Sequence, residues 1–296
     1  MAEAIEFALE DCLADTWAQV DAGLLARAEA QEAMRRRRAF EAAWQSTAAV
    51  GAGGSVAAYR LRVFRDYIQY EEALATLLAV RLGRRAAAGR KRRRDGGDSR
   101  LPVNRLTGRW HRRVLALYER AVRCRWLRGD ESIWLGYARY ALQAGSVSIC
   151  RRVLSRALSA IGARSCRVYA VAGAVEADVR GSVGTARALF QRGLRAHAQQ
   201  PEMWAQYFAF ELAFALRLHK RRQVLLADAH EAVRLQVPLL VLQHGAQQLT
   251  SGGARQQFVQ RCRELIPSVA ADAAAVQSVL SEHLEQWERT GGSDCV

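Results

Sequence analysis

Apolar residues recur along most of the chain at spacings of three and four, which is the spacing of one face of an α-helix. The residues between them are rich in Ala, Arg, Leu and Gln, which favour helix, and only four prolines occur among 296 residues. This pattern excludes an all-β fold and predicts an all-α protein.

The helical pattern repeats with a period of 35 residues. A motif of three apolar residues, each three positions apart, begins at Trp134, Tyr169 and Trp204, and an earlier copy begins at Phe64, two periods before Trp134. Because residues three apart share one helix face, each copy predicts the first helix of a hairpin with its side chains buried. The residues expected in the repeat core are Phe64, Tyr67, Trp134, Tyr137, Tyr169, Trp204 and Tyr207.

A turn is expected after two of these helices. Gly145-Ser146 recurs as Gly181-Ser182, 36 residues later, and supplies a glycine that can end one helix and a serine that can start the next. The second helices of these hairpins follow, with Arg156 and Arg192 in equivalent positions. New helices are expected to begin at the prolines Pro201, Pro238 and Pro267.

Two short helices cannot bury their apolar faces alone, so we expect the hairpins to stack into an α-solenoid. A tetratricopeptide array has nearly this period, but the small residues that mark its helices are absent here. An aromatic residue, a Tyr three positions later and a following Glu, such as Glu71 or Glu211, take their place. This pattern is typical of the half-a-TPR (HAT) repeat, and we predict an α-solenoid of HAT helical hairpins.

Basic residues exceed acidic residues by 44 to 29, a formal net charge of +15. Twelve basic and two acidic residues lie between positions 84 and 113. The centre of this segment has no apolar side chain to bury and ends in glycines, which predicts a flexible basic linker over 83–108. Such a segment can neutralise RNA phosphates, act as a nuclear import signal, or simply be solvated. The candidate RNA-binding residues are Arg90, Lys91, Arg92, Arg93, Arg94, Arg109, Arg112 and Arg113.

A second basic run, Arg35 to Arg38, lies within a helical pattern that includes Phe40 and Trp44. We interpret this run as the polar face of an amphipathic helix.

Further motifs narrow the class of HAT protein. They are Gly23-Leu24-Leu25, Glu29, the run Arg35 to Arg38, Phe40-Glu41, the stretch Phe64-Arg65-Asp66-Tyr67-Ile68-Gln69-Tyr70-Glu71, and the repeats at 116–122, 133–137 and 186–195. In this order, over about residues 10 to 220, they resemble the U3 small nucleolar RNA-associated protein 6 family. The chain departs from the family at Ala28, Ala30 and Ala33, where isoleucine is usual, and is weakly matched from Val237.

The resemblance implies a non-enzymatic structural subunit of the small-subunit processome, the nucleolar particle built around U3 small nucleolar RNA that processes pre-ribosomal RNA toward 18S RNA. Its expected partners are other proteins of the particle, with U3 or pre-ribosomal RNA as a further contact that the sequence does not decide. The expected location is the nucleus and nucleolus. The resemblance and the repeat together divide the chain into an N-terminal family domain (1–82), the basic linker (83–108), HAT repeats (109–236) and a C-terminal helical cap (237–296).

The sequence also predicts no catalysis, cofactor, metal or membrane association. No P-loop, dinucleotide-binding, nucleophile-elbow or zinc-protease motif occurs, and the six cysteines form no C-x-x-C pair. The acidic first residues lack the positive start of a signal peptide, and no apolar run approaches the roughly 18 residues that span a bilayer.

Two other functions are alternatives. One is a HAT scaffold of pre-mRNA splicing or 3′-end processing, which shares the repeat but would lack the N-terminal combination of arginine run and Tyr-Ile-x-Tyr-Glu. The other is a tetratricopeptide-like adaptor, which would need a carboxylate clamp that the sequence does not contain.

Overall fold

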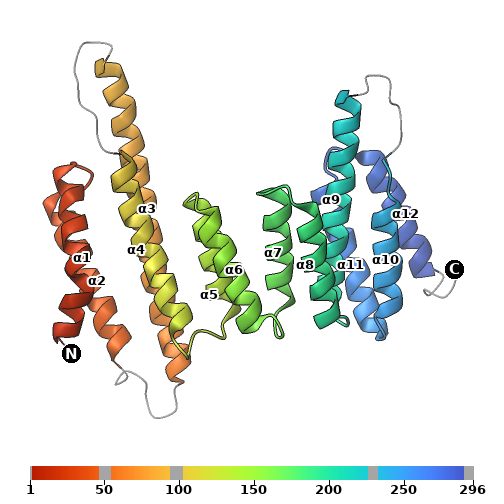
Figure 1. The fold of residues 1–296 in the computed structure, drawn as a ribbon, viewed down its shortest axis with the longest axis horizontal. Helices are drawn as coiled ribbons and strands as arrows, with labels where there is room; N and C mark the ends of the chain where they lie inside the picture. The colour runs from red at the N-terminus through yellow and green to blue at the C-terminus, as the bar shows by residue number, and fades with distance from the viewer. Residues whose placement is uncertain (1, 47–54, 94–102, 226–232, 290–296) are drawn as a thin grey trace. The chain divides into compact units, whose positions relative to one another are not determined.

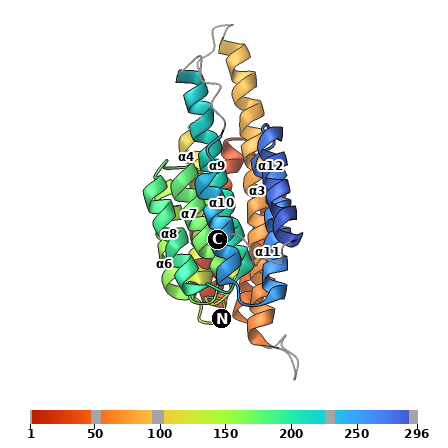
Figure 2. The same cartoon turned by 90° about the vertical axis from the view of Figure 1, so that its right-hand side faces the viewer.

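A computed structural model describes residues 2–46, 55–93, 103–225 and 233–289. Within these ranges the backbone forms twelve α-helices and no strand (Figure 1), and Figure 2 shows the same helices turned by 90°. This confirms the predicted all-α fold. The helices are α1 (Ala2–Asp21), α2 (Arg27–Gln45), α3 (Val56–Arg93), α4 (Val103–Arg123), α5 (Glu131–Gln143), α6 (Val147–Ile161), α7 (Cys166–Asp178), α8 (Val183–Ala196), α9 (Pro201–Leu225), α10 (Gln236–Gln248), α11 (Gly252–Val269) and α12 (Ala274–Arg289).

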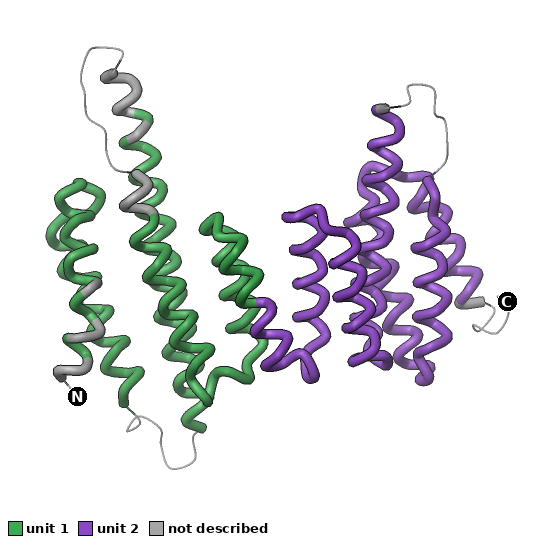
Figure 3. Tube along the Cα trace, viewed as in Figure 1, with its two compact units in different colours: residues 1–153 green, residues 154–296 purple. Residues whose placement is uncertain are grey.

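The chain divides into two compact units, residues 1–153 and 154–296 (Figure 3). In the first unit, α1 packs against α2, and α3 packs against α4. In the second unit, α7 packs against α8, α9 against both α10 and α11, and α11 against α12. Helices that follow each other in the chain therefore form packed pairs.

The predicted glycine turns are present after α5 and α7. Gly145 and Gly181 have positive φ angles of 72° and 67°, a conformation that glycine adopts without a steric penalty. At the end of α5, the Gly145 and Ser146 N–H groups donate to the carbonyls of Leu142 and Ala141 at 2.9 and 2.8 Å. These two bonds satisfy carbonyls that the last turn of a helix leaves free.

The aromatic motif lies on the inner faces of α3, α5, α7 and α9. Trp134 and Trp204, 70 residues apart, each donate an indole hydrogen bond to the carbonyl six residues earlier, Arg128 at 2.8 Å and Ala198 at 2.9 Å. The same contact therefore recurs two periods apart. Of the residues expected in the repeat core, Tyr207 is half-buried and the others are buried: Phe64, Tyr67, Trp134, Tyr137, Tyr169 and Trp204.

Helix α3 continues to Arg93 and α4 begins at Val103, so the segment 83–108 is helical at both ends where a flexible linker was predicted. Arginine, lysine and alanine have high helix propensity, and charge alone does not end a helix. The central stretch 94–102 lies outside the described residues, and the motif-based domain boundaries stay a prediction.

Two of the three prolines that were expected to begin a helix lie in the first turn of one. Pro201 is the first residue of α9, and Pro238 lies in the first turn of α10. Pro267, expected to begin a helix, lies inside α11 instead. Because α11 ends two residues later, at Val269, this proline removes only one hydrogen bond near the helix terminus.

Candidate functional site

The predicted RNA-binding residues fall into two groups. Arg90, Lys91, Arg92 and Arg93 belong to the end of α3, where the structure describes the backbone only, and Arg94 lies outside the described residues. Arg109, Arg112 and Arg113 lie on α4, and the structure brings these three together at one pocket.

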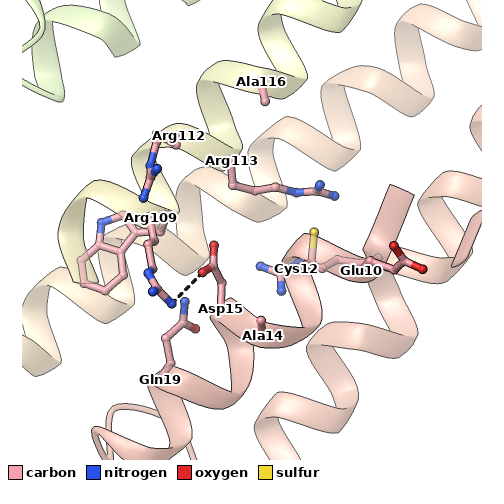
Figure 4. A pocket seen from close by; sticks show the side chains of 11 residues that line it. Glu10, Cys12, Ala14, Asp15, Gln19, Arg109, Arg112, Arg113 and Ala116 are labelled. Carbon is pink, nitrogen blue, oxygen red and sulfur yellow. Dashed lines mark hydrogen bonds and ion pairs between the residues drawn. The ribbon is translucent and has the colours of Figure 1, made fainter. Parts of the chain in front are cut away.

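This pocket, of about 590 Å³, lies in the first unit between α1 and α4, with one residue from α2 (Figure 4). Four of its side chains are arginines and two are carboxylates. We call it the arginine pocket, and its lining residues are Glu10, Cys12, Ala14, Asp15, Gln19, Arg37, Arg109, Trp110, Arg112, Arg113 and Ala116.

The three arginines of α4 differ in their contacts. Arg109 donates from Nη1 to Asp15 Oδ1 of α1 at 3.0 Å, the dashed contact in Figure 4. Arg112 is exposed, and its Nε donates to the Gly108 carbonyl at 3.2 Å. Arg113 is half-buried, and its Nη2 donates to the Tyr67 hydroxyl and lies 3.6 Å from Glu41 Oε1. Arg113 is therefore tied to the core, whereas Arg112 is open to a ligand.

Arg37 corrects the interpretation of the run Arg35 to Arg38 as a polar helix face. Its three neighbours in the run are exposed, but Arg37 is buried. Its Nε and Nη2 donate to the two carboxylate oxygens of buried Glu71 on α3 at 2.6 and 2.9 Å. Its Nη1 donates to Thr16 Oγ1 on α1 at 2.7 Å. Burial opposes the charge of Arg37, but the hydrogen bonds and the attraction of Glu71 outweigh it and raise the pKa of the guanidinium.

Glu41, one turn after Arg37 on α2, is a second buried carboxylate. It accepts hydrogen bonds from the Tyr67 hydroxyl at 3.2 Å and from Arg120 Nη1 at 2.8 Å. Burial raises the pKa of the Tyr67 hydroxyl, which therefore stays protonated and can act as a donor. The hydrogen bonds of these buried groups thus connect α1, α2, α3 and α4, and Arg37 also lines the arginine pocket.

Of the residues that line the pocket, sequence reasoning proposed only Arg109, Arg112 and Arg113, and it did not assign the others, such as Arg37, to a site. A signal existed for Arg37, because buried Ala30, Ala33, Arg37 and Glu41 follow one another at helical spacing along one face of α2. No sequence motif marks Gln19 or Trp110, since their role depends on the packing of α1 against α4.

Among the described residues, no three His, Cys, Asp or Glu side chains gather as a metal site would require. The five described cysteines are free thiols, and burial raises the pKa of Cys12 and Cys262. A raised pKa keeps these thiols protonated and makes them poor nucleophiles. Across the described ranges, none of the helices combines the length and apolar character that crossing a bilayer requires.

The structure thus shows an all-helical protein in which helices pack in pairs around buried aromatic side chains. The chain is homologous to U3 small nucleolar RNA-associated protein 6, which confirms the resemblance drawn from its motifs. It is 28% identical to the Schizosaccharomyces pombe protein of that name over 225 residues, covering 76% of this chain and 41% of that protein. It is 29% and 28% identical over 160 residues to the Homo sapiens and Mus musculus homologues, covering 54% of this chain and 24% of each. No protein-family model matches the chain.

The chain therefore spans less than half the length of these curated relatives.

Proposed function

We propose that the chain is a non-enzymatic scaffold subunit of the U3 small nucleolar particle, acting in the processing of pre-ribosomal RNA toward 18S RNA. The observation that carries this proposal is the homology to U3 small nucleolar RNA-associated protein 6 over 225 residues of the chain. The proposed location is the nucleus and nucleolus, and the proposed partners are other proteins of the particle.

We further propose that the packed helix pairs are HAT hairpins of an α-solenoid. The 35-residue period and the recurring indole contacts of Trp134 and Trp204 support this assignment. A second recurring contact also supports this assignment. Arg187 donates two hydrogen bonds to buried Glu211, both at 2.7 Å, just as Arg37 donates two to Glu71. In both places an arginine of the preceding helix binds the Glu that follows the aromatic motif. Solenoid faces are long and suited to binding other proteins.

The basic residues Arg90 to Arg94, together with exposed Arg112, are proposed to contact RNA phosphates. A HAT scaffold of pre-mRNA splicing or 3′-end processing is the second candidate, because it would share the repeat. The arrangement of Arg37, Glu41 and Glu71 within the N-terminal motifs favours the first candidate, since these residues belong to the stretches that carry the family resemblance.

The RNA that purifies with the tagged chain tests the proposal. We expect enrichment of U3 and pre-ribosomal RNA over the untagged strain. Enrichment of spliceosomal or messenger RNA would support the second candidate. Recovery of no RNA would favour an adaptor and contradict both.

A further inference from the structure

An exposed tryptophan lies in the loop that joins α4 to α5, residues 124–130. Trp126 is 43% exposed, and among the side chains described between residues 108 and 178 it is the only large apolar one that is exposed. Contact of the indole with water costs free energy that stacking on a ligand would recover. The loop is therefore a candidate contact surface.

The loop has a counterpart before α9, which shows what the fold itself requires. Trp134 and Trp204 stand at equivalent positions of the repeat, and each donates to the carbonyl six residues earlier. Counted from these tryptophans, buried Leu127 corresponds to buried His197. The carbonyls of both residues accept the N–H group three positions later at 3.0 Å. The two loops therefore share a buried side chain and their backbone contacts.

The two loops differ on either side of the buried residue. The same count pairs Trp126 with Ala196, and Arg128 with Ala198. An alanine on each side is thus sufficient for the shared backbone contacts. The exposed tryptophan and arginine of the first loop are not required by the repeat, which leaves them for a function of their own.

Positive charge surrounds the exposed indole. The Arg125 guanidinium lies over the Trp126 ring, with its Cζ 4.2 Å from the ring centre. The Arg128 N–H donates to the Cys124 carbonyl at 2.9 Å, as in a turn of α-helix. Arg125 and Arg128 are three residues apart and exposed, so they share one side of this turn. The loop thus presents an aromatic ring together with two neighbouring cations.

The carboxylates beside the loop bind other groups. Glu119 accepts from Arg123 Nε at 2.8 Å, and Asp130 caps α5 by accepting the N–H group two residues later at 2.9 Å. Arg125 and Arg128 form no ion pair with any residue that the structure describes. Their charges are therefore available to an anion.

We propose that this loop binds single-stranded RNA, with a base stacked on the exposed indole of Trp126 and the phosphates of the strand bound by Arg125 and Arg128. Every base offers an aromatic face and every nucleotide a phosphate, so the contact does not select a sequence. The inference rests on the proposed function for the presence of RNA, and it adds a contact site that the basic run Arg90 to Arg94 does not include.

RNA suits the loop better than a protein partner. A tryptophan that anchors a protein interface is typically surrounded by further contacts that exclude water. The exposed side chains beside Trp126 are instead those of Arg123, Arg125 and Arg128. An aromatic ring flanked by cations is the combination by which proteins bind single strands, because stacking and phosphate contacts then act on the same nucleotides.

The loop is also separate from the basic run at the end of α3. Figure 1 shows the C-terminal end of α3 and the loop after α4 at opposite ends of the α3–α4 pair. Helix α4 has 21 residues, which corresponds to a length of about 30 Å. The two sites can therefore be tested independently.

Binding of short RNA to the full chain tests the proposal. The chain with Arg90 to Arg94 changed to Gln is the background, so that binding at that run does not mask the loop. In this background we expect Trp126→Ala to weaken binding of a fluorescent oligouridylate of about ten nucleotides about tenfold. Trp17→Ala, at another exposed tryptophan, is the matched control and should bind as the background does.

An abasic oligomer of the same length separates stacking from charge. It carries the phosphates without the bases, so Trp126→Ala should bind it as tightly as the background does. Equal affinity of the background and Trp126→Ala for oligouridylate would overturn the proposal. An equal loss with both oligomers, or no binding by the background at all, would overturn it as well.

The phosphate contacts are tested by changing Arg125 and Arg128 together to Gln. We expect weaker binding of both oligomers and a salt slope lower by about 1.4, if each charge releases about 0.7 counterion. An unchanged slope would contradict these contacts. Loss of a protein from the purified tagged Trp126→Ala chain, with RNA affinity unchanged, would assign the loop to a protein partner and overturn the proposal. Because the binding measurements involve no particle, their failure leaves the proposed function to its own test by U3 purification.

Discussion

Among single residues, three buried charged side chains lie close together where α2, α3 and α4 meet. Arg37, Glu41 and Glu71 are all buried, and each makes at least one hydrogen bond to a side chain of another helix. A buried ion pair adds little net stability compared with apolar residues, but removal of one partner leaves a charge that is costly to bury. The pair Arg37–Glu71 therefore fixes which faces of α2 and α3 meet.

Glu71→Gln is expected to destabilise the protein by about 3–5 kcal/mol, because Arg37 keeps its charge but loses its carboxylate. Urea unfolding measures this loss. Arg38→Gln in the same basic run, at an exposed position paired with Glu6 across the surface, should leave the midpoint nearly unchanged. Equal effects of the two substitutions would show that Arg37 is not buried with Glu71. The double variant Arg37→Met, Glu71→Leu should recover much of the lost stability.

Glu29, in the first turn of α2, gives a pH-dependent contribution. Bidentate hydrogen bonds from Arg81 at 2.7 Å, followed by one from the Ala26 N–H, lower the pKa of Glu29 to about 2. A lowered pKa in the folded state stabilises the protein above the ordinary pKa of 4.5, and this contribution is lost as the pH falls toward 2. The contribution is small because solvent screens the pair.

The stability difference between the unmodified chain and Glu29→Gln should therefore narrow as the pH falls from 5 toward 2, since the unmodified carboxylate becomes protonated in this range. Urea midpoints measured across that range test it. A difference that stays constant with pH would contradict the assigned ion pair with Arg81.

The 35-residue period predicted the burial of some residues and not of others. The burial of Trp134 and Trp204 could be predicted because both stand at the same position of the repeat. Arg37 was assigned to the polar face because its partner, Glu71, is 34 residues away on another helix. Trp110 was not singled out, since the absence of an acceptor for its indole depends on how α4 packs against α1.

At the level of helices, α7 and α8 approach closely at Gly173. A Cβ added at this position would lie 2.5 Å from Cε2 of the Phe190 ring on α8. We expect Gly173→Ala to destabilise the second unit by about 1–3 kcal/mol, because the ring must move within a packed core. Gly184→Ala on α8, where an added Cβ meets nothing within 4 Å, should be neutral or slightly stabilising. Similar unfolding midpoints for the two variants would contradict the close packing of this pair.

At the level of helices, the sequence predicted where helices occur more accurately than it predicted the residues at which they begin and end. The glycine turns at Gly145 and Gly181 could be predicted, because positive φ angles favour this residue type. The end of α3 could not, since a run of arginine and lysine is compatible both with a solvated linker and with an exposed helix. Pro267 shows the same limit, because a proline near a helix end can stand just inside it.

For the whole molecule, the net charge of +15 supports binding to a polyanion. Changing Arg90, Lys91, Arg92, Arg93 and Arg94 to Gln should weaken binding to unrelated RNAs about equally and lower the salt slope by up to about 3 to 4, if each charge releases about 0.7 counterion. Filter binding at several salt concentrations measures the slope. Changing Arg261 and Arg263 of α11 to Gln is the control and should alter neither quantity. An unchanged slope in the five-residue variant would mean that this run does not contact RNA.

Sedimentation of the tagged chain tests most directly whether it is a component of a U3-containing particle. A gradient of nuclear extract, probed in each fraction for the chain and for U3 RNA, gives the measurement. We expect the chain to sediment with U3 in large particles and to move to the top of the gradient after ribonuclease treatment. A chain that stays in the top fractions of the untreated extract, apart from U3, would contradict it.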